Sequence, residues 1–397
     1  MGKGALDGVK VLDLTRVLAG PYAAMMLADL GADVIKIERP KYGDDTRAFE
    51  PSTNGESAYF YNLNRNKRGI TLDLKNEDGK KVFLELVKKA DVVLENFRPG
   101  VMEKLGLGYD KLKEVNPKII YGSVSGFGHY GPYTKRPGYD IIAQAMGGLM
   151  STTGWPDGLP TRSGTAIGDI LGGMNVTIGI LSAYISRQKT GIGQKVDVAL
   201  VDSVVSGLEA ITQIYLTSGK EPTRTGNRYA SSYPYDSFKT KDGMIVIGAG
   251  NDKLYFLLCD LMGKPELKTE EKFLTNPLRL EHFEELKEII ENWLSDYSSK
   301  DAVDMLLDKG VPAGPINTIK DIVKDPHIAD AREMFVEIDH PKAGRVKVTG
   351  NPIKLSGTPV KIEKAAPTLG QHTNEVLKEY LNLTDKEIEE LDKKGIF

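Results

Sequence analysis

The stretch VKVLDLTRVLAGPYAAMMLADLGADVIKIE, residues 9–38, decides the predicted fold. Residues 9–15 are rich in apolar and β-branched side chains, which indicates a buried strand. Residues 22–31 favour a helix that stops at its terminal glycine, and residues 33–38 again have the composition of a strand. A strand, a helix and a second strand at this spacing predict one βαβ unit of a parallel sheet.

The same alternation continues over about the first half of the chain. Long helical stretches cover residues 170–188 and 203–218, and the small residues of the first would allow close packing. Repeated units of this kind predict the α/β class, with a large, doubly wound, Rossmann-like domain. The further strand-like runs are RGITLDL (68–74), DVVLEN (91–96), KIIYGSVS (118–125) and QKVDVA (194–199).

Two linker-like segments divide the chain. Residues 220–235 are rich in Pro, Gly, Ser and Tyr, and a second linker begins at Asp325. The region between them carries a hairpin signal at Asp242-Gly243 and several helical stretches, which predicts a small α+β domain. We therefore predict a large α/β domain that begins in residues 1–220, a linker and small inserted domain in 221–330, and a return segment with C-terminal helices in 331–397.

The composition narrows the class of function. The 397 residues carry a net charge of -3 at pH 7, so the chain has no global attraction to nucleic acid or to anionic lipid. Cys259 is the single cysteine, which excludes a disulfide framework and multi-thiolate metal sites. The sequence shows neither a leader peptide nor an apolar run of about 18 residues. We expect a cytoplasmic protein that binds neither nucleic acid nor membrane.

Three common kinds of site lack their motifs. The five histidines show no paired ligand spacing, so we expect no metal site. A Gly-x-Ser-x-Gly elbow of a serine esterase is missing. The first turn holds only Gly20, where a dinucleotide-binding turn has a set of glycines, and Glu38 is the one residue placed like a ribose-binding acid.

Asp169, in the stretch TRSGTAIGDILGGMNVTIGIL (161–181), is the candidate nucleophile. A purely structural interpretation is that Asp169 caps the helix that follows. The functional interpretation uses the same position, because a carboxylate between Gly168 and Gly172 leaves room for a bulky electrophile. A carboxylate can attack a thioester and form a mixed anhydride. Spacing alone allows both interpretations.

Basic residues recur after successive predicted strands. Arg39 follows the second strand, Lys75 the third and Arg98 the fourth, with Lys104 beyond it. Because the carboxyl ends of parallel strands meet at one edge of the sheet, these cations favour a phosphorylated ligand there. Solvated surface charges are the alternative for any one of them.

The chain resembles the class III coenzyme A transferases, the family of formyl-CoA:oxalate and crotonobetainyl-CoA:carnitine CoA-transferases. The resemblance implies an enzyme that moves CoA from an acyl-CoA thioester to a free carboxylic acid, with acyl-CoA as substrate and no prosthetic group. The matching motifs run nearly from end to end: LDGVKVLDLTRVLAGPYAAMMLADLGADVIKIERP, ENFRPGVMEKLGL, SVSGFGHYGPY, GYDIIAQAMGG, GDILGG, GVPAGPINTI and APTLGQHTNEVL.

The resemblance also implies residue roles. Asp169 matches the catalytic nucleophile, which forms aspartyl anhydride and aspartyl-CoA thioester intermediates, and we expect Tyr139 and Asp140 to line the substrate pocket. Backbone amides near Leu18 and Ala19 are the candidates to hold the thioester oxygen. Family members are typically interlocked homodimers, which we expect here. The implied CoA contacts are Leu18, Ala19, Arg39, Leu72, Lys75, Asn96, Phe97, Arg98 and Lys104.

Two positions guide the choice of substrate and reaction. Leu18 stands where formyl-CoA transferase has a glutamine, and the glycine-rich closing segment of that enzyme corresponds only to IGAGND (247–252). Oxalate and formate are therefore poor candidates, and a branched, aromatic or 2-hydroxy acid is favoured. Tyr139 stands where α-methylacyl-CoA racemases need a histidine base, which favours transfer over racemisation. A racemase-like enzyme and a non-catalytic CoA-binding protein are the alternatives.

Overall fold

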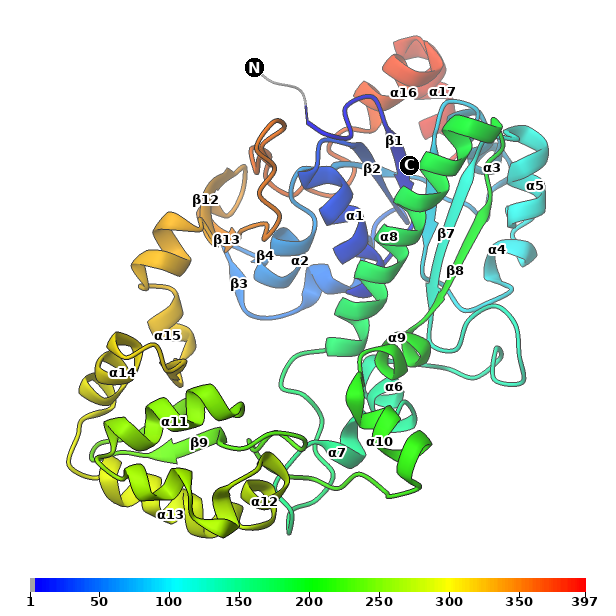
Figure 1. The fold of residues 1–397 in the computed structure, drawn as a ribbon. Helices are drawn as coiled ribbons and strands as arrows, with labels where there is room; N and C mark the ends of the chain where they lie inside the picture. Colours follow the sequence, from blue (N-terminus) through cyan, green and yellow to red (C-terminus); the bar gives the residue numbers. More distant parts are fainter. Residues whose placement is uncertain (1–3) are drawn as a thin grey trace. The chain divides into compact units, whose positions relative to one another are not determined.

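The computed structural model describes residues 4–397, which form two compact units (Figure 1). The first unit comprises residues 4–149, 162–213 and 326–397. The second comprises Met150–Thr161 and Ile214–Asp325. The segment 150–161, counted with the large domain in the sequence-based division, is held in the second unit by Arg224, whose Nη2 donates to Gly158 O at 2.8 Å.

A six-stranded sheet forms the centre of the first unit, in the order β5-β2-β1-β6-β7-β8. All neighbouring strands in it run parallel. The strand order reverses between β1 and β6, and this switch point is where open α/β sheets bind their ligands. The predicted α/β class with a parallel central sheet is confirmed. The strands are β1 (Lys10–Asp13), β2 (Asp33–Glu38), β5 (Arg68–Thr71), β6 (Val92–Glu95), β7 (Ile120–Ser125) and β8 (Lys195–Ala199).

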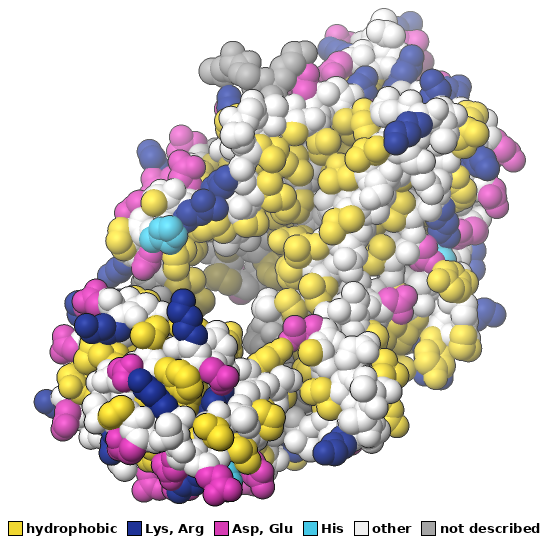
Figure 2. Space-filling view, viewed as in Figure 1, with side chains coloured by type: hydrophobic (Ala, Val, Ile, Leu, Met, Phe, Trp, Pro, Cys, Tyr) yellow, Lys and Arg dark blue, Asp and Glu magenta, His cyan; other side chains and the backbone are white. Residues whose placement is uncertain are grey.

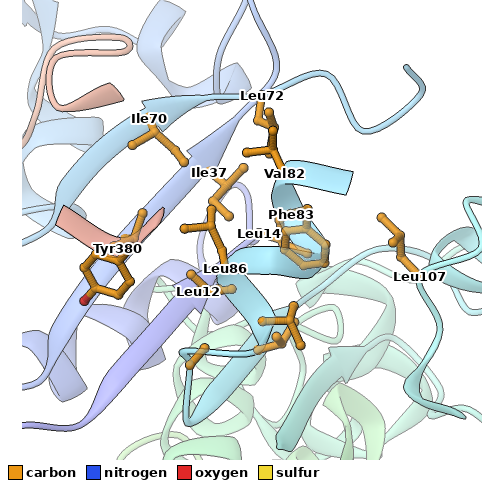
Figure 3. Packing of buried hydrophobic residues seen from close by; sticks show 14 of the residues in the cluster. Leu12, Leu14, Ile37, Ile70, Leu72, Val82, Phe83, Leu86, Leu107 and Tyr380 are labelled. Atoms are coloured by element: carbon orange, nitrogen blue, oxygen red, sulfur yellow. The ribbon is translucent and has the colours of Figure 1, made fainter. Parts of the chain in front are cut away.

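Helices cover both faces of this sheet, which explains why apolar side chains of its strands are buried on both sides. Val11 packs on one face with α1 (Ala19–Asp29) and α8 (Ile167–Thr190). Leu12 points to the other face, where Ile37, Phe83 and Leu86 surround it (Figure 3). The helices of that second layer are α3 (Glu77–Val87), α5 (Tyr109–Val115), α16 (Thr373–Leu381) and α17 (Asp385–Asp392).

Two helix boundaries differ from the sequence-based expectation. Helix α1 begins at Ala19 rather than at residue 22, because a proline is tolerated in a first helical turn, where its missing N–H is not needed. The stretch 203–218 was expected to be one helix, and this was wrong. It is divided between α9 (Leu200–Ser206) and α10 (Ala210–Ser218), because Glu209 has a φ of 43°, which interrupts the helical backbone.

Helix α8 packs closely through its glycines, as its sequence predicts. A Cβ added at Gly173 would lie 2.6 Å from the carbonyl oxygen of Ala19, and one added at Gly179 would lie 2.4 Å from Cγ1 of Val196. By length and composition alone α8 could cross a membrane, but one side of it packs against α1 and the sheet. Its other side exposes Ile178, and hydrophobic side chains gather over α1 and α8 in Figure 2.

The second unit has a core of its own around a small antiparallel sheet of order β11-β10-β9. Strands β9 (Tyr235–Lys239) and β10 (Met244–Gly248) form the predicted hairpin, and β11 (Ala313–Pro315) pairs with β10. Buried residues of three helices cover one face of this sheet. These helices are α11 (Asp252–Leu261), α13 (Phe283–Leu294) and α14 (Ser299–Asp308).

Shorter elements complete both units. A hairpin of β12 (Phe335–His340) and β13 (Gly344–Thr349) follows the insertion and packs against α2 (Ala58–Leu63). The remaining strands and α-helices are β3 (Ser52–Thr53), β4 (Glu56–Ser57), α4 (Val101–Lys104), α6 (Asp140–Met146), α7 (Leu149–Thr152), α12 (Asn276–Glu281) and α15 (Ile319–Ile322).

Candidate active site

The first turn, residues 15–21, comprises most of the loop after β1 and the first residues of α1, at the carboxyl edge of the sheet. Asn96, just after β6, pairs with both backbone groups of Arg16: its Oδ1 accepts from Arg16 N at 2.8 Å and its Nδ2 donates to Arg16 O at 2.6 Å. Val17 follows with a φ of 67°, a left-handed conformation that is unusual for a β-branched residue. Asn96, a predicted CoA contact, thus holds the first turn in shape.

Three consecutive backbone amides of the first turn are available as donors. Among residues 4–397, the N–H groups of Leu18, Ala19 and Gly20 have no hydrogen-bond partner. They lie at the start of α1, where the helix dipole adds partial positive charge. Such amides stabilise a negatively charged oxygen. The amides of Leu18 and Ala19 are the ones named from the sequence as candidates to hold the thioester oxygen.

A cavity of about 240 Å³ lies at the carboxyl ends of β1, β2 and β5. Four of the predicted CoA contacts line it: Arg39, Leu72, Lys75 and Phe97. Arg98 and Lys104 are exposed and flank Val101 in the sequence, and Val101 lines the cavity. Leu18, Ala19, Asn96, Arg98 and Lys104 are not among the residues of the cavity wall.

Two arginines at this cavity share one carboxylate. Asp45 accepts from Arg39 Nη2 at 2.7 Å and from Arg16 Nη1 at 3.2 Å. The three side chains are 42% to 52% exposed, so these ion pairs are weak and a ligand phosphate can compete for the guanidinium groups. The Arg16 guanidinium also lies over the Phe97 ring, 5.7 Å from its centroid.

Asp169 is the third residue of α8 and does not cap that helix, so the structural interpretation as an N-cap is wrong. The N-cap is Ala166, whose side chain makes no capping bond. Asp140 performs the capping instead: its Oδ1 accepts from Gly168 N at 2.8 Å and from Asp169 N at 3.4 Å. The carboxylate of Asp169 is thereby left free of a local structural role.

Asp140 also changes the acidity of Asp169. Burial, and after it the negative charge of Asp140, raise the pKa of Asp169 to about 7. Gln144 holds Asp140 in place, since its Nε2 donates to Asp140 Oδ2 at 2.7 Å, while its Oε1 accepts from Ser163 N at 2.8 Å. A poorly solvated carboxylate is a stronger nucleophile than one in water.

The nucleophile candidate and the first turn lie on the same side of α8. Asp169 precedes Gly173 by one helical turn, and Gly173 touches the first turn at Ala19. Tyr59, from α2, packs in one cluster with Leu18. Burial, followed by the charge of Asp169, raises the pKa of Tyr59 to about 12. The phenol therefore stays protonated beside the carboxylate.

Tyr139 and Asp140 stand at the start of α6, but only one of them contacts the nucleophile's helix. Asp140 binds the backbone of α8, whereas Tyr139, at the N-cap position, has a 69% exposed side chain. Sequence reasoning missed Arg16 and Tyr59. Arg16 follows the first strand as Arg39 follows the second, so that signal was available, whereas Tyr59 reaches the site only through tertiary packing.

In residues 4–397, no group of His, Cys, Asp and Glu side chains is arranged to hold a metal ion. The sequence matches the profile of CoA-transferase family III over residues 6–373. The chain belongs to this family. The resemblance inferred from the motifs is thus confirmed, and the chain is an acyl-CoA:carboxylate CoA-transferase of family III.

Relatives of this family III CoA-transferase cover nearly its whole length. An acetyl-CoA:oxalate CoA-transferase from Acetobacter aceti is 43% identical over 380 residues, with 95% of this chain and 96% of the relative covered. A succinyl-CoA:glutarate CoA-transferase from Homo sapiens is 41% identical over 392 residues, covering 98% and 89%. The crystal structure of a CAIB/BAIF family protein from Brucella suis superposes with a TM-score of 0.84 at 41% identity, covering 96% and 100%.

Proposed function

We propose that this CoA-transferase works through covalent intermediates on Asp169. The Asp169 carboxylate attacks the thioester carbonyl carbon, the CoA thiolate leaves, and a mixed anhydride forms. The thiolate then attacks the aspartyl carbonyl, which releases the donor acid and leaves an aspartyl-CoA thioester. The acceptor carboxylate attacks the aspartyl carbonyl and expels the thiolate, which gives a second mixed anhydride. The thiolate then attacks the acceptor carbonyl of this anhydride, which forms the new acyl-CoA and releases the Asp169 carboxylate.

The observation that carries this proposal is the position of Asp169 relative to Asp140. Asp140 satisfies the helix amides that would otherwise bind the Asp169 carboxylate, and it raises the pKa of Asp169 together with burial. The nucleophile is therefore poorly stabilised as an anion before the reaction. The unpaired amides of Leu18 and Ala19 support the second part of the proposal, in which they stabilise the oxygen of the tetrahedral intermediate.

The strand-end cavity is the proposed site of the CoA nucleotide. Its wall combines apolar residues such as Leu72 and Phe97 with the cations Arg16, Arg39 and Lys75. Arginine and lysine bind phosphate groups through charge-assisted hydrogen bonds. Because the first turn borders this cavity, the thioester end of a bound acyl-CoA has a short path to the free amides.

For the acceptor we propose a short dicarboxylic acid, with branched and 2-hydroxy acids favoured. Similar proteins are named as transferases for oxalate, glutarate and mesaconate, and one is named succinyl-CoA--D-citramalate CoA-transferase. The apolar Leu18 beside the amides supports an acid larger than formate or oxalate. A panel of acetyl-CoA and succinyl-CoA donors against these acids and an aromatic acid, analysed by mass spectrometry, tests the choice.

Chemical trapping tests the mechanism itself. We expect hydroxylamine, added after an acyl-CoA donor, to give a hydroxamate on Asp169, and we expect Asp169→Asn to abolish both the adduct and the transfer. Asp110→Asn, an exposed carboxylate on α5, is the matched control and should behave as wild type. A protein that incorporates α-deuterium into a 2-methylacyl-CoA without an acceptor acid would instead be a racemase. Absence of both activities would instead support the alternative of a non-catalytic CoA-binding protein.

A homodimer in the cytoplasm is the proposed state of the enzyme. The exposed side of α8 carries Met174, Ile178 and Ile185, of which Ile178 is 59% and Ile185 61% exposed. Apolar side chains spaced along one helix face are typical of a surface that a partner covers. A second copy of this chain is the proposed partner. The cytoplasmic location is supported only by the buried, unpaired Cys259 and by the use of acyl-CoA.

A further inference from the structure

Two buried lysines bind the backbone at opposite ends of the first turn. Nζ of Lys36, on β2, donates to the carbonyl oxygen of Thr15 at 2.9 Å. Nζ of Lys67, just before β5, donates to the carbonyl oxygen of Pro21 at 3.1 Å. Neither lysine side chain has any solvent exposure. The segment between these two carbonyl groups contains the free amides of the first turn.

Each lysine is paired with an aspartate that also binds the turn. Lys36 contacts Asp44 Oδ2 at 3.0 Å, and Asp44 Oδ1 accepts from Val17 N at 3.3 Å. Lys67 contacts Asp13 Oδ2 at 2.9 Å, and Asp13 Oδ1 accepts from Thr15 N at 2.9 Å. Two ammonium groups and two carboxylates therefore hold the backbone of the turn at Thr15, Val17 and Pro21.

Stability alone does not account for this arrangement. Buried ion pairs are costly to desolvate, and well-packed apolar residues often stabilise a fold as well or better. Here all four charged side chains have no solvent exposure, and they surround a backbone with Val17 at positive φ. An unusual backbone conformation persists only where its surroundings determine it, and such conformations cluster at functional sites.

We infer that Lys36 and Lys67 are positioning residues, which hold the first turn so that the amides of Leu18, Ala19 and Gly20 converge on the thioester oxygen. This inference rests on the proposed function, because it gives those amides their role. Neither lysine touches the substrate. Each acts through a carbonyl oxygen, and loss of either contact releases one end of the turn.

The test uses a double variant that removes both charges of one pair. In Asp13→Asn/Lys67→Met, the amide oxygen of the introduced side chain can still accept from Thr15 N, whereas Pro21 O and the Asn64 side-chain oxygen lose the Lys67 donor. We expect kcat to fall by about 10- to 100-fold, as for a misplaced rather than a missing oxyanion donor, while KM for the acyl-CoA donor changes by less than about threefold.

The matched control is Asp29→Asn/Arg65→Met. Arg65 and Asp29 form another buried pair, at 2.7 Å with 1% and 0% exposure, but their hydrogen bonds go to residues outside the first turn. This control should lose comparable thermal stability and keep kcat within about twofold. Equal losses of kcat in control and test variant, or an unchanged kcat in the test variant, would overturn the inference.

Two further outcomes are separable. If the Lys67 variant is insoluble, Lys36→Met/Asp44→Asn removes the donor at the other end of the turn and is judged by the same fall in kcat. Wild-type enzyme is carried through the hydroxylamine trapping in parallel. Absence of an Asp169 adduct in wild type contradicts the proposed function, whereas a normal adduct with an unaffected double variant contradicts only the positioning role.

Discussion

Asp169 and Asp140 divide two tasks that a single aspartate could have combined. The sequence pattern allowed Asp169 to be a helix cap or a nucleophile, because both need an aspartate at the start of a helix. The structure gives the capping to Asp140, which lies 29 positions earlier in the sequence. No local pattern could show this, since the contact depends on how α6 packs against α8.

Removal of the Asp140 charge should move the pH dependence of acylation. Only the ionised Asp169 is nucleophilic, so the single-turnover rate should rise with pH and level off above about pH 7. In Asp140→Asn the repulsion is gone but burial, the larger cause, remains. The midpoint should therefore shift to lower pH, while staying above the ordinary aspartate value. Rates of adduct formation between about pH 5 and pH 9 measure it.

Asp110→Asn is the control, with an unshifted midpoint. An upward shift in Asp140→Asn would show that Asp140 stabilises the anion of Asp169, which contradicts the assigned cause. Loss of all activity at every pH would mean that Asp140 is needed for more than its charge.

The Asp45 carboxylate should lower the affinity of the enzyme for CoA, because it competes with the CoA phosphates for two arginines. It pairs with Arg16 and Arg39, which must exchange this partner for phosphate when CoA binds. We expect Asp45→Asn to lower Kd for CoA by about two- to fivefold and Arg39→Gln to raise it by a similar factor, with both effects fading at high salt. Titration calorimetry at two salt concentrations measures this. A weaker affinity in Asp45→Asn would mean that Asp45 organises the arginines instead.

At the scale of elements, the strands were the most predictable part. The central strands bury apolar side chains on both faces, so short apolar runs mark them in the sequence, although in β2 the buried Lys36 interrupts the run. Helix ends were less predictable. Helix α1 begins as early as Ala19 because a proline, here Pro21, is tolerated near the start of a helix. The break before α10 depends on the backbone conformation of Glu209. Tyr59 reaches the site from α2, a helix without any recognisable motif.

The close packing of α8 on the first turn gives the element-scale prediction. Gly173→Ala would place a methyl group 2.6 Å from Ala19 O, which is backbone and has little freedom to move. We expect a loss of about 1–3 kcal/mol in the free energy of unfolding and a fall of about tenfold in kcat, because the amides shift relative to Asp169. Chemical denaturation and steady-state kinetics measure the two effects.

Gly179→Ala is the matched control on the same helix. Its added methyl group would meet the side chain of Val196 at 2.4 Å, away from the first turn. It should destabilise the protein without lowering kcat. Equal kcat values for the two variants would show that α8 does not set the position of the turn.

At the scale of the whole molecule, the exposed face of α8 predicts the assembly. Introduction of charge by Ile178→Asp/Ile185→Asp should convert a dimer to monomers, because two carboxylates cannot be buried unpaired in an interface. Light scattering coupled to size-exclusion chromatography measures the mass. Leu274→Asp, at another exposed apolar position, should leave the dimer intact. A monomeric wild type, or a dimeric double variant, contradicts the assignment.

The first turn, residues 15–21, has a consequence for how this enzyme can diversify. It borders the proposed nucleotide cavity and also contains the amides proposed to bind the reacting carbonyl oxygen. Affinity for CoA and the rate of reaction therefore depend on the same few residues. A substitution there that changed one would change the other. Natural variation among transferases that differ mainly in their acid should therefore concentrate outside Thr15 and Arg16, which line the cavity.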